Sequence, residues 1–332
     1  MASGLVAAFA WFHQWWDALA WLVMLVFLAG SALEFYDRDL ARYVLVAAWG
    51  VLALFWVASI YQFVFDQKSI TEGLAVIAAI PLSLYVGYLL ATGRDRLMMV
   101  SRAVAVMWAI YLPFSSLPFL RNPMIAIVTD QTAAVLSLLG AKFTVVVGNH
   151  FPPGVVVDHA PKPYNHSFVF QFPNRNGGYN IVYTIETACT GIGSMAIFGG
   201  LIAAVEAPLR RKLKALVASV GVIWILNVTR NVFIAYMFGY QRLQVFPQFV
   251  MSTFNLDTPL EVSYIVADRI VAQSLSVVAL VGITYLVVTQ LPEVLTIVEE
   301  GLYVLTRKEY DLQSALGASI RADGGTDPET GE

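Results

Sequence analysis

The chain is poor in cysteine and in charge. Cys189 is the only cysteine among 332 residues, and charged residues make up 13% of the sequence. A single cysteine excludes an intrachain disulfide, so Cys189 is either a packing residue or a chemical group. Hydrophobic residues reach 58% and the mean hydropathy is +0.68, which lies outside the range of soluble domains. The composition predicts a polytopic membrane protein.

The chain also lacks a basic N-terminal region and an excess of positive charge. The stretch from Met1 to Asp17 contains no lysine or arginine, whereas a cleavable signal peptide begins with a basic region, so we expect an uncleaved N-terminus. Excess positive charge is also absent, because the net charge is −3 and comes mostly from the acidic segment 322–332. This charge favours no nucleic-acid partner. We expect the acidic tail to be disordered.

Long apolar runs dominate the rest of the chain. A helix needs about 20 apolar residues to cross the roughly 30 Å of hydrocarbon in a bilayer. Seven runs approach or meet this length, at 18–33, 43–65, 73–93, 103–120, 187–205, 215–241 and 270–292. The fold class predicted is an all-α polytopic membrane protein with a bundle of about seven transmembrane helices. The first run is short, which leaves an eighth span at the N-terminus open.

Positive residues in the short loops predict the orientation, because lysine and arginine accumulate on the cytoplasmic side. They cluster after the first, third and fifth runs, at Arg38 and Arg42, at Arg94, Arg96 and Arg102, and in RRKLK at 210–214. The opposite loops carry few. We therefore expect an external N-terminus, a cytoplasmic C-terminus, and a long external connection at 121–186.

That external connection has secondary structure of its own. Asn122-Pro123 predicts a helix start, and Gly140 predicts its end. The segments KFTVVVG, GVVVDH, SFVFQF and YNIVYTIE then have strand composition, and NRNGG is a hairpin signal. The predicted organisation is N-terminal spans at 1–120, an external helix and β-ribbon at 121–186, catalytic spans at 187–292, and at 293–332 a cytoplasmic amphipathic segment with the acidic tail.

Three residues from separate runs are predicted to lie at one membrane depth. If 187–210 is a continuous helix, Cys189 lies roughly 32 Å above Arg210, at the outer surface. Arg230 interrupts an uncharged run roughly 24 Å above Lys214, and Arg269 opens the last run. All three therefore reach the external side of the membrane.

Each residue also has a simpler interpretation. Free cysteines pack well in cores, and Arg269 with Asp268 fits an interfacial anchor. Arg230 is harder to explain structurally, since a charge within a span costs at least a few kcal/mol and requires a cavity or a partner. Asn227 and Asn231 share its helical face. A functional site is the default interpretation of Arg230.

Thiolate chemistry would connect these groups. A cysteine at the amino end of a helix and near guanidinium groups has its thiolate stabilised, which makes it a nucleophile near neutral pH. Guanidinium also donates several hydrogen bonds to a developing oxyanion. It does not serve as a general base.

The blocks TACTGIGS, LNVTRNVFIAY and YIVADRIV resemble the three catalytic blocks of the exosortase/archaeosortase superfamily of membrane cysteine transpeptidases. Exosortases generally have histidine where this chain has Arg269, so the resemblance is to the archaeosortases. It implies that Cys189 is the nucleophile that forms a thioester, and that Arg230 and Arg269 stabilise the thiolate and the tetrahedral intermediate. The proton donor to the leaving amine stays unassigned.

The resemblance also implies a substrate class and a location. Archaeosortases recognise secreted surface proteins, such as the S-layer glycoprotein, that end in a PGF motif, a transmembrane helix and a basic tail. Cleavage is linked to attachment of a lipid anchor, so a membrane lipid is the implied acceptor and the active site faces outward. No cofactor is implied.

Two other classes remain as alternatives. A transporter or channel would use Arg230 to line an anion path, although the charges gather at one surface and no inverted repeat is visible. A membrane acyltransferase would carry a fatty acyl group on Cys189. The species bound to the enzyme would separate the three classes. A linked peptide indicates the transpeptidase, a linked fatty acid indicates the acyltransferase, and neither indicates the transporter or channel.

The external loop contributes further candidates. His150, His159 and His166 occur there with Tyr183 and Glu186 as possible proton donors, but their spacing is not that of a metal site and we assign no metal. The sequon at Asn165 predicts a glycosylation site. The strands before Cys189 could also pair with an extended substrate, for example at Val182, or serve only as a scaffold.

Overall fold

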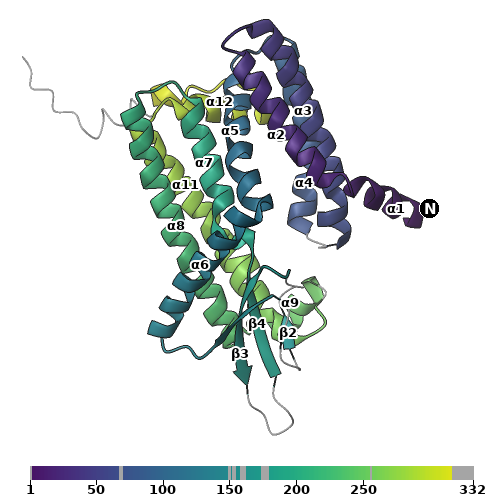
Figure 1. Cartoon of the computed structure of the whole chain (residues 1–332), viewed down its shortest axis with the longest axis vertical. Helices are drawn as coiled ribbons and strands as arrows, with labels where there is room; N and C mark the ends of the chain where they lie inside the picture. The colour runs from purple at the N-terminus through teal and green to yellow at the C-terminus, as the bar shows by residue number, and fades with distance from the viewer. Residues whose placement is uncertain are drawn as a thin grey trace, which may run out of the picture. The chain divides into compact units, whose positions relative to one another are not determined.

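The computed structural model describes residues 2–66, 70–148, 151, 155–157, 162–172, 179–254 and 256–315. These residues are mostly helical, with one small sheet, which confirms the predicted fold class. The chain divides into two compact units (Figure 1). Unit 1 comprises 1–112, 196–216 and 287–332, and unit 2 comprises 113–195 and 217–286.

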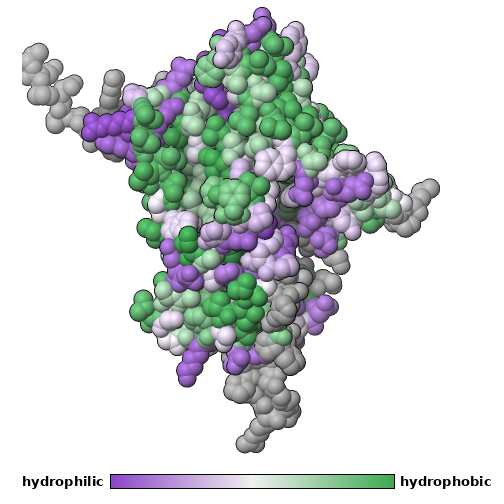
Figure 2. All heavy atoms as spheres, in the orientation of Figure 1, coloured by the Kyte–Doolittle hydropathy of each residue, from purple (hydrophilic) through white to green (hydrophobic). Residues whose placement is uncertain are grey.

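Six helical segments in the described residues are long and apolar enough to cross a membrane. They are Trp16–Leu33, Arg38–Asp66, Glu72–Ala91, Leu97–Ser116, Leu209–Gly239 and Pro259–Gln290. Their surfaces carry many exposed hydrophobic side chains, including Val217, Ile225, Val278 and Val281. Figure 2 shows such residues in green over much of the helical surface. Because lipid covers such faces, this exposure is what a multi-pass membrane protein requires.

The run at 187–205, predicted as a seventh span, is shorter than expected. Its helix, α7, covers Ile192–Ala204. Thirteen residues rise roughly 20 Å, which is less than the hydrocarbon thickness. The helix begins late because Gly191 has a left-handed backbone, with φ +76°. A continuous helix from residue 187 was therefore wrong, so the rise along it does not give the depth of Cys189, and the place of the thiol at the outer surface stays a prediction.

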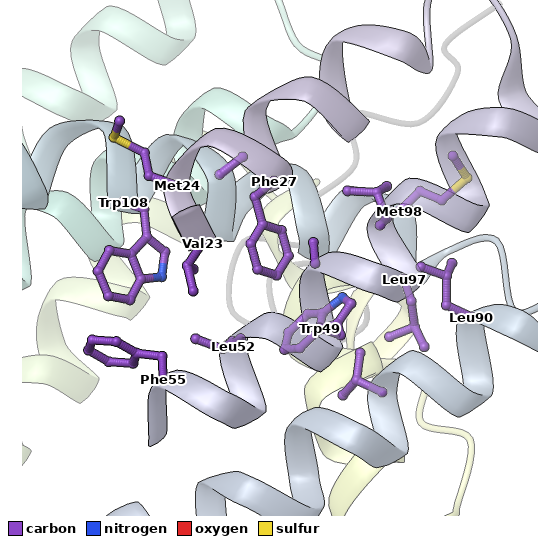
Figure 3. Close-up of a cluster of buried hydrophobic side chains, with 14 of the residues drawn as sticks. Val23, Met24, Phe27, Trp49, Leu52, Phe55, Leu90, Leu97, Met98 and Trp108 are labelled. Atoms are coloured by element: carbon purple, nitrogen blue, oxygen red, sulfur yellow. The ribbon is translucent and has the colours of Figure 1, made fainter. Parts of the chain in front are cut away.

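In unit 1, α2 (Trp16–Leu33), α3 (Arg38–Ile60), α4 (Ile70–Ala91) and the start of α5 (Leu97–Ser116) enclose a hydrophobic core. Figure 3 shows Phe27 and Trp49 in this core. Their rings pack edge to face, with 5.3 Å between the ring centres. The Trp49 indole N–H donates to Ser101 Oγ at 2.9 Å. Burial of such large side chains stabilises a fold by about 1.5–3 kcal/mol each.

The remaining helices of unit 1 are α1 (Ala2–His13), which precedes this core, and α12 (Val294–Thr306), near the C-terminal end of the described chain. The part of α7 in this unit packs closely on α5. A Cβ placed on Gly200 would overlap the Ala103 backbone oxygen, and one on Gly199 would lie 2.7 Å from Ile110. Glycine at these positions lets the two helices approach.

Unit 2 begins with α6, which covers Pro118–Leu138. The predicted start, with Asn122 as the N-cap, was wrong by five residues, because the N-cap is the extended Leu117 and Pro118 is the first helical residue. The predicted end is confirmed: α6 stops at Leu138, and Gly140 has φ +74°. The strands follow as β1 (Thr144–Val147), β2 (Val155–Val157), β3 (His166–Phe172) and β4 (Tyr179–Ile185).

The four strands form one sheet in the order β1-β3-β4-β2. β3 is antiparallel to both β1 and β4, with His166 opposite Ile185, and β2 is parallel to β4. The predicted strands are confirmed, and the NRNGG segment lies outside the described residues. Val182 has a strand neighbour on each side, Val169 and Val157. The hypothesis that a substrate pairs at Val182 was therefore wrong.

Buried aromatic residues join the sheet to the helices of unit 2. Phe168, Phe170 and Tyr183 pack with residues of α6 and of α8 (Leu209–Gly239). Figure 1 shows α6 beside β3 and β4, and α6 contacts both strands. A Cβ on Gly239 would lie 2.6 Å from the Phe170 ring, so the end of α8 is tightly packed against the sheet.

After α8, the chain forms α9 (Pro247–Phe254), η3 (Pro259–Glu261), α10 (Val262–Tyr264), η4 (Ile265–Ala272) and α11 (Gln273–Gln290). The segment η4 is a π-helix, whose hydrogen bonds are wider than those of an α-helix. Such segments are rare and recur at functional sites. Asp268 and Arg269 lie within it.

Candidate functional site

Cys189 lies in a tight turn that joins the sheet to α7. Strand β4 ends at Ile185, Glu186 is extended, and Thr187–Thr190 forms a single 3₁₀ turn, η2. The Cys189 N–H donates to the Glu186 carbonyl at 2.9 Å, and Thr190 Oγ1 donates to the Thr187 carbonyl at 2.6 Å. The thiol is thus carried by a 3₁₀ turn before α7 and not by the first turn of a long helix.

Gly191 makes this turn possible. Its φ of +76° is unfavourable for residues with a Cβ. Space is limiting as well, since a Cβ at Gly191 would lie 3.2 Å from Asn227 Cγ. Glycine is therefore required both by the backbone conformation and by the close approach of α8.

Two asparagines on α8 hold the main chain of Cys189. The Nδ2 groups of Asn227 and Asn231 both donate to the Cys189 carbonyl oxygen, the latter at 2.7 Å. This confirms that the two residues share a helical face. Tyr183 Oη donates to Asn231 Oδ1 at 3.1 Å, and both of these side chains are buried. We call Tyr183, Asn227 and Asn231 the carbonyl clamp.

The thiol is partly buried and uncharged at neutral pH. Its Sγ lies 3.9 Å from the Thr184 carbonyl oxygen, to which it donates. Burial raises the pKa of Cys189 to about 11, although a backbone hydrogen bond from Glu186 and the charge of Arg230 lower it. The predicted effect of Arg230 is present, but burial outweighs it. The stabilisation of the thiolate that was expected from the arginines is thus smaller than the opposing effect of burial.

Arg230 and Arg269 meet at one carboxylate. Arg230 Nη2 lies 2.6 Å from Asp268 Oδ1, and Arg269 Nε lies 3.9 Å from Asp268 Oδ2. Asp268 is mostly buried, with 14% of its side chain exposed. Arg230 is near enough to Cys189 for its charge to affect the thiol, and Arg269 is joined to this group through Asp268. Sequence reasoning noticed Asp268 only as a surface partner of Arg269.

Arg230 has a donor without an acceptor. Its Nε is buried and has no hydrogen-bond partner within the described residues. An unsatisfied buried donor costs about 1–3 kcal/mol. A guanidinium remains charged at all accessible pH values, so this group is a fixed cation with an available N–H.

Two of the other residues predicted in the external region, His166 and Tyr183, lie in strands of the sheet. His166 lies in β3, where burial lowers its pKa even though Asp130 opposes the shift. His150 and His159 lie outside the described residues. Tyr183 belongs to the carbonyl clamp, and burial raises its pKa well above the usual value.

Asn165 is fully buried, and its Nδ2 donates to Glu186 Oε1 at 3.2 Å. Glycosylation requires an accessible amide, so the predicted site at Asn165 is wrong for the folded chain. This amide instead fixes the side chain of the residue that begins the Cys189 turn. The described residues contain no group of three metal-binding side chains.

Comparison with known proteins agrees with the motifs. The transmembrane exosortase family model matches residues 11–256, which include Cys189 and Arg230 but end before Arg269. Archaeosortase A of Haloferax volcanii is 42% identical over 311 residues, which cover 91% of this chain and 97% of that protein. Archaeosortase A of Natronomonas pharaonis is 40% identical over 292 residues, covering 87% and 89%.

No solved structure matches the chain. The family model nevertheless covers well over half of the residues, and both relatives match along nearly their full length. The six apolar helices agree with a multi-pass enzyme of this kind. The chain belongs to the transmembrane exosortase family.

Proposed function

We propose that the chain is a membrane cysteine transpeptidase that cleaves C-terminal PGF-type sorting signals of secreted surface proteins. The cleaved surface protein is then transferred to a lipid acceptor. One observation carries the proposal. The only cysteine has its carbonyl held by Asn227 and Asn231, and the same turn of α8 carries Arg230. Similarity to two proteins named Archaeosortase A supports the same class.

In the proposed reaction, Cys189 Sγ attacks the carbonyl carbon of the scissile peptide bond. The thiol loses its proton, an oxyanion forms, and the amine leaves with a proton as the C–N bond breaks. The product is a thioester on Cys189. A nucleophile on the acceptor then attacks the thioester and releases the thiol.

The protonated resting thiol constrains the first step. A group with a pKa of about 11 is ionised to only about one part in ten thousand at pH 7. Arginine cannot accept the proton, because its guanidinium is already charged. The proton of the thiol must therefore leave in the course of the attack, and neither Arg230 nor Arg269 accepts it.

Arg230 and Arg269 would stabilise the oxyanion. The buried Nε of Arg230, which has no partner in the described chain, supports this role because it can donate without first breaking a protein hydrogen bond. Arg269 would add positive charge from the other side of Asp268. Removal of one such donor in other enzymes costs about 10²–10³ in rate.

The substrate class fits the surroundings of the site. A sorting signal with its own transmembrane helix lies in the same bilayer as the six apolar helices of the enzyme. We propose that the site faces outward, with the N-terminus external and the C-terminus cytoplasmic. This orientation requires the short segment 187–204 to cross, and η2 with α7 rises at most roughly 28 Å.

The test compares wild type with Cys189→Ala in lipid vesicles that contain a reporter with a PGF motif, a transmembrane helix and a basic tail. We expect cleavage by the wild type and none by the variant at equal abundance. Mass spectrometry of the wild type should find the reporter peptide on Cys189. A fatty acyl group there would favour the acyltransferase, and cleavage by Cys189→Ala would end the assignment of the nucleophile.

A further inference from the structure

We infer that Asp268 is the positioning residue of this site, whose carboxylate holds Arg230 and Arg269 in the arrangement that catalysis requires. The inference rests on the proposed function of the three catalytic residues. It assigns a role to a carboxylate that contacts neither the peptide nor the sulfur and that acts through the two guanidinium groups.

The geometry is that of a carboxylate shared between two cations. Oδ1 lies 2.6 Å from Arg230 Nη2, which is a short, charge-assisted hydrogen bond. Oδ2 lies 3.9 Å from Arg269 Nε. Each oxygen therefore faces a different arginine, and one small side chain fixes their separation.

The backbone around Asp268 explains how neighbouring residues take part together. Asp268 and Arg269 are consecutive, and consecutive residues of an α-helix do not face each other. Here they lie in the π-helix Ile265–Ala272, whose wider turn changes the directions of the side chains. The Arg269 Nε is consequently near the carboxylate of its own neighbour.

Arg230 is held at both ends. Its backbone lies on α8 between Asn227 and Asn231, which bind the Cys189 carbonyl. Its guanidinium is held by Asp268. The position of the cation relative to the cysteine main chain is thus set by these two attachments, and only the second can be changed without disturbing the nucleophile.

Asp268 also influences the charge of the thiol. Burial and the charges of Asp268 and Glu186 raise the pKa of Cys189, while the backbone hydrogen bond of Glu186 and the charge of Arg230 lower it. Tyr183 and Tyr264 belong to the same electrostatic cluster. Loss of the Asp268 charge should therefore make Cys189 ionise more readily, even as the arginines lose their fixed arrangement.

This opposition gives a test. Loss of the fold would also expose Cys189 and speed its alkylation, so each variant is first shown to unfold at a temperature close to that of the wild type. In the full-length enzyme in lipid vesicles, Asp268→Asn keeps the shape of the side chain and removes its charge. We expect alkylation of Cys189 by iodoacetamide at pH 8 to become several-fold faster. We expect kcat for reporter cleavage to fall on the order of a hundredfold, because the guanidinium groups are misplaced. KM should change much less.

Two further variants complete the experiment. Asp257→Asn makes the same chemical change at an exposed position outside the site and should leave both rates unchanged. Asp268→Glu restores the charge and should recover part of kcat. Full cleavage by Asp268→Asn, or a parallel fall in cleavage and alkylation, would overturn the inference. If Cys189→Ala still cleaves the reporter, the proposed function itself fails, whatever Asp268→Asn does.

Discussion

Arg94 in unit 1 and Arg230 in unit 2 each form an ion pair with a nitrogen–oxygen distance of 2.6 Å, to Glu300 and Asp268. The two arginines differ in how many of their other N–H groups have acceptors. In unit 1, Arg94 donates through Nε and Nη2 to Glu300 and through Nη1 and Nη2 to Glu309. Its guanidinium also lies 3.3 Å from the centre of the Tyr303 ring. In unit 2, Arg230 donates to Asp268 through Nη2, and its buried Nε has no partner among the described residues.

The difference agrees with a structural role for Arg94 and with the catalytic role proposed for Arg230. Arg94 uses all of its donor groups to fasten α12 to the loop between α4 and α5. An unbonded Nε alone does not identify a catalytic arginine, because Arg42 and Arg102 also have one. Arg230 is distinguished by its neighbours, since its charge acts on the only thiol of the chain.

The largest expected effect on activity comes from Arg230→Lys. Lysine keeps the charge but loses the planar fork, so it cannot bind Asp268 and the oxyanion together. We expect cleavage to fall on the order of 10²–10³-fold, with little loss of abundance. Reporter cleavage at matched enzyme levels measures this, and Arg242→Lys, at an exposed position, is the control. Near-full activity would reduce Arg230 to a general positive charge.

Arg94→Met should lower stability and leave activity unchanged, which is the reverse of the result expected for Arg230→Lys. It leaves Glu300, whose side chain is 2% exposed, without its main partner, and breaking a buried pair costs about 3–5 kcal/mol. We expect a lower free energy of unfolding and unchanged cleavage per folded molecule. Thermal unfolding in detergent tests this. The double variant with Glu300→Met should recover stability, and failure to do so would mean that the ion pair is not the cause.

Arg269→His should be milder than either change, because the related exosortases have histidine at this position. We expect an activity loss on the order of tenfold at pH 7, by analogy with other displaced charged groups. Imidazole carries a charge only below its pKa, ordinarily near 6.5, so the activity of the variant relative to wild type at the same pH should rise as the pH falls from 8 to 6. A ratio of variant to wild-type activity that stays constant over this pH range would contradict the expectation.

The last prediction changes no residue and concerns the thiol of the unmodified enzyme. With a pKa of about 11, alkylation of Cys189 should become about tenfold faster for each pH unit between 7 and 10. Enzyme with its sole cysteine intact is treated with iodoacetamide, and the modified fraction is followed over time. A rate that already levels off below pH 8 would show that the arginines, and not burial, control the thiol.

The sequence carried much of the fold because its signals are local. Apolar runs predicted the spanning helices, and strand composition with Gly140 predicted the end of α6 and the strands after it. Cys189 and Arg230 stood out because a thiol and a charge are rare in such runs. The third predicted residue, Arg269, was noted because it opens the last run, and its catalytic role was inferred from the motif.

What the sequence could not supply depends on pairing between distant segments. Nothing local shows that Asp268 turns to Arg230, 38 residues away, or that Asn165 reaches Glu186. The register that places β3 and β4 inside the sheet is equally non-local. Gly191 did carry a signal, because a glycine directly after the TACT turn permits a left-handed residue, but the apolar run around it predicted an unbroken helix.

The carbonyl clamp has a consequence for what the enzyme can recognise. With Asn227 and Asn231 fixing its carbonyl, the main chain at Cys189 cannot shift to meet a badly placed peptide. The entropy of ordering the nucleophile is lost during folding and not during turnover, so a correctly placed peptide reacts without further ordering of the enzyme. Because the main chain at Cys189 is held in place, a misplaced substrate peptide has to change its own conformation to react. Under the proposed function, such a site favours short signals of nearly invariant backbone shape over long signals of variable sequence.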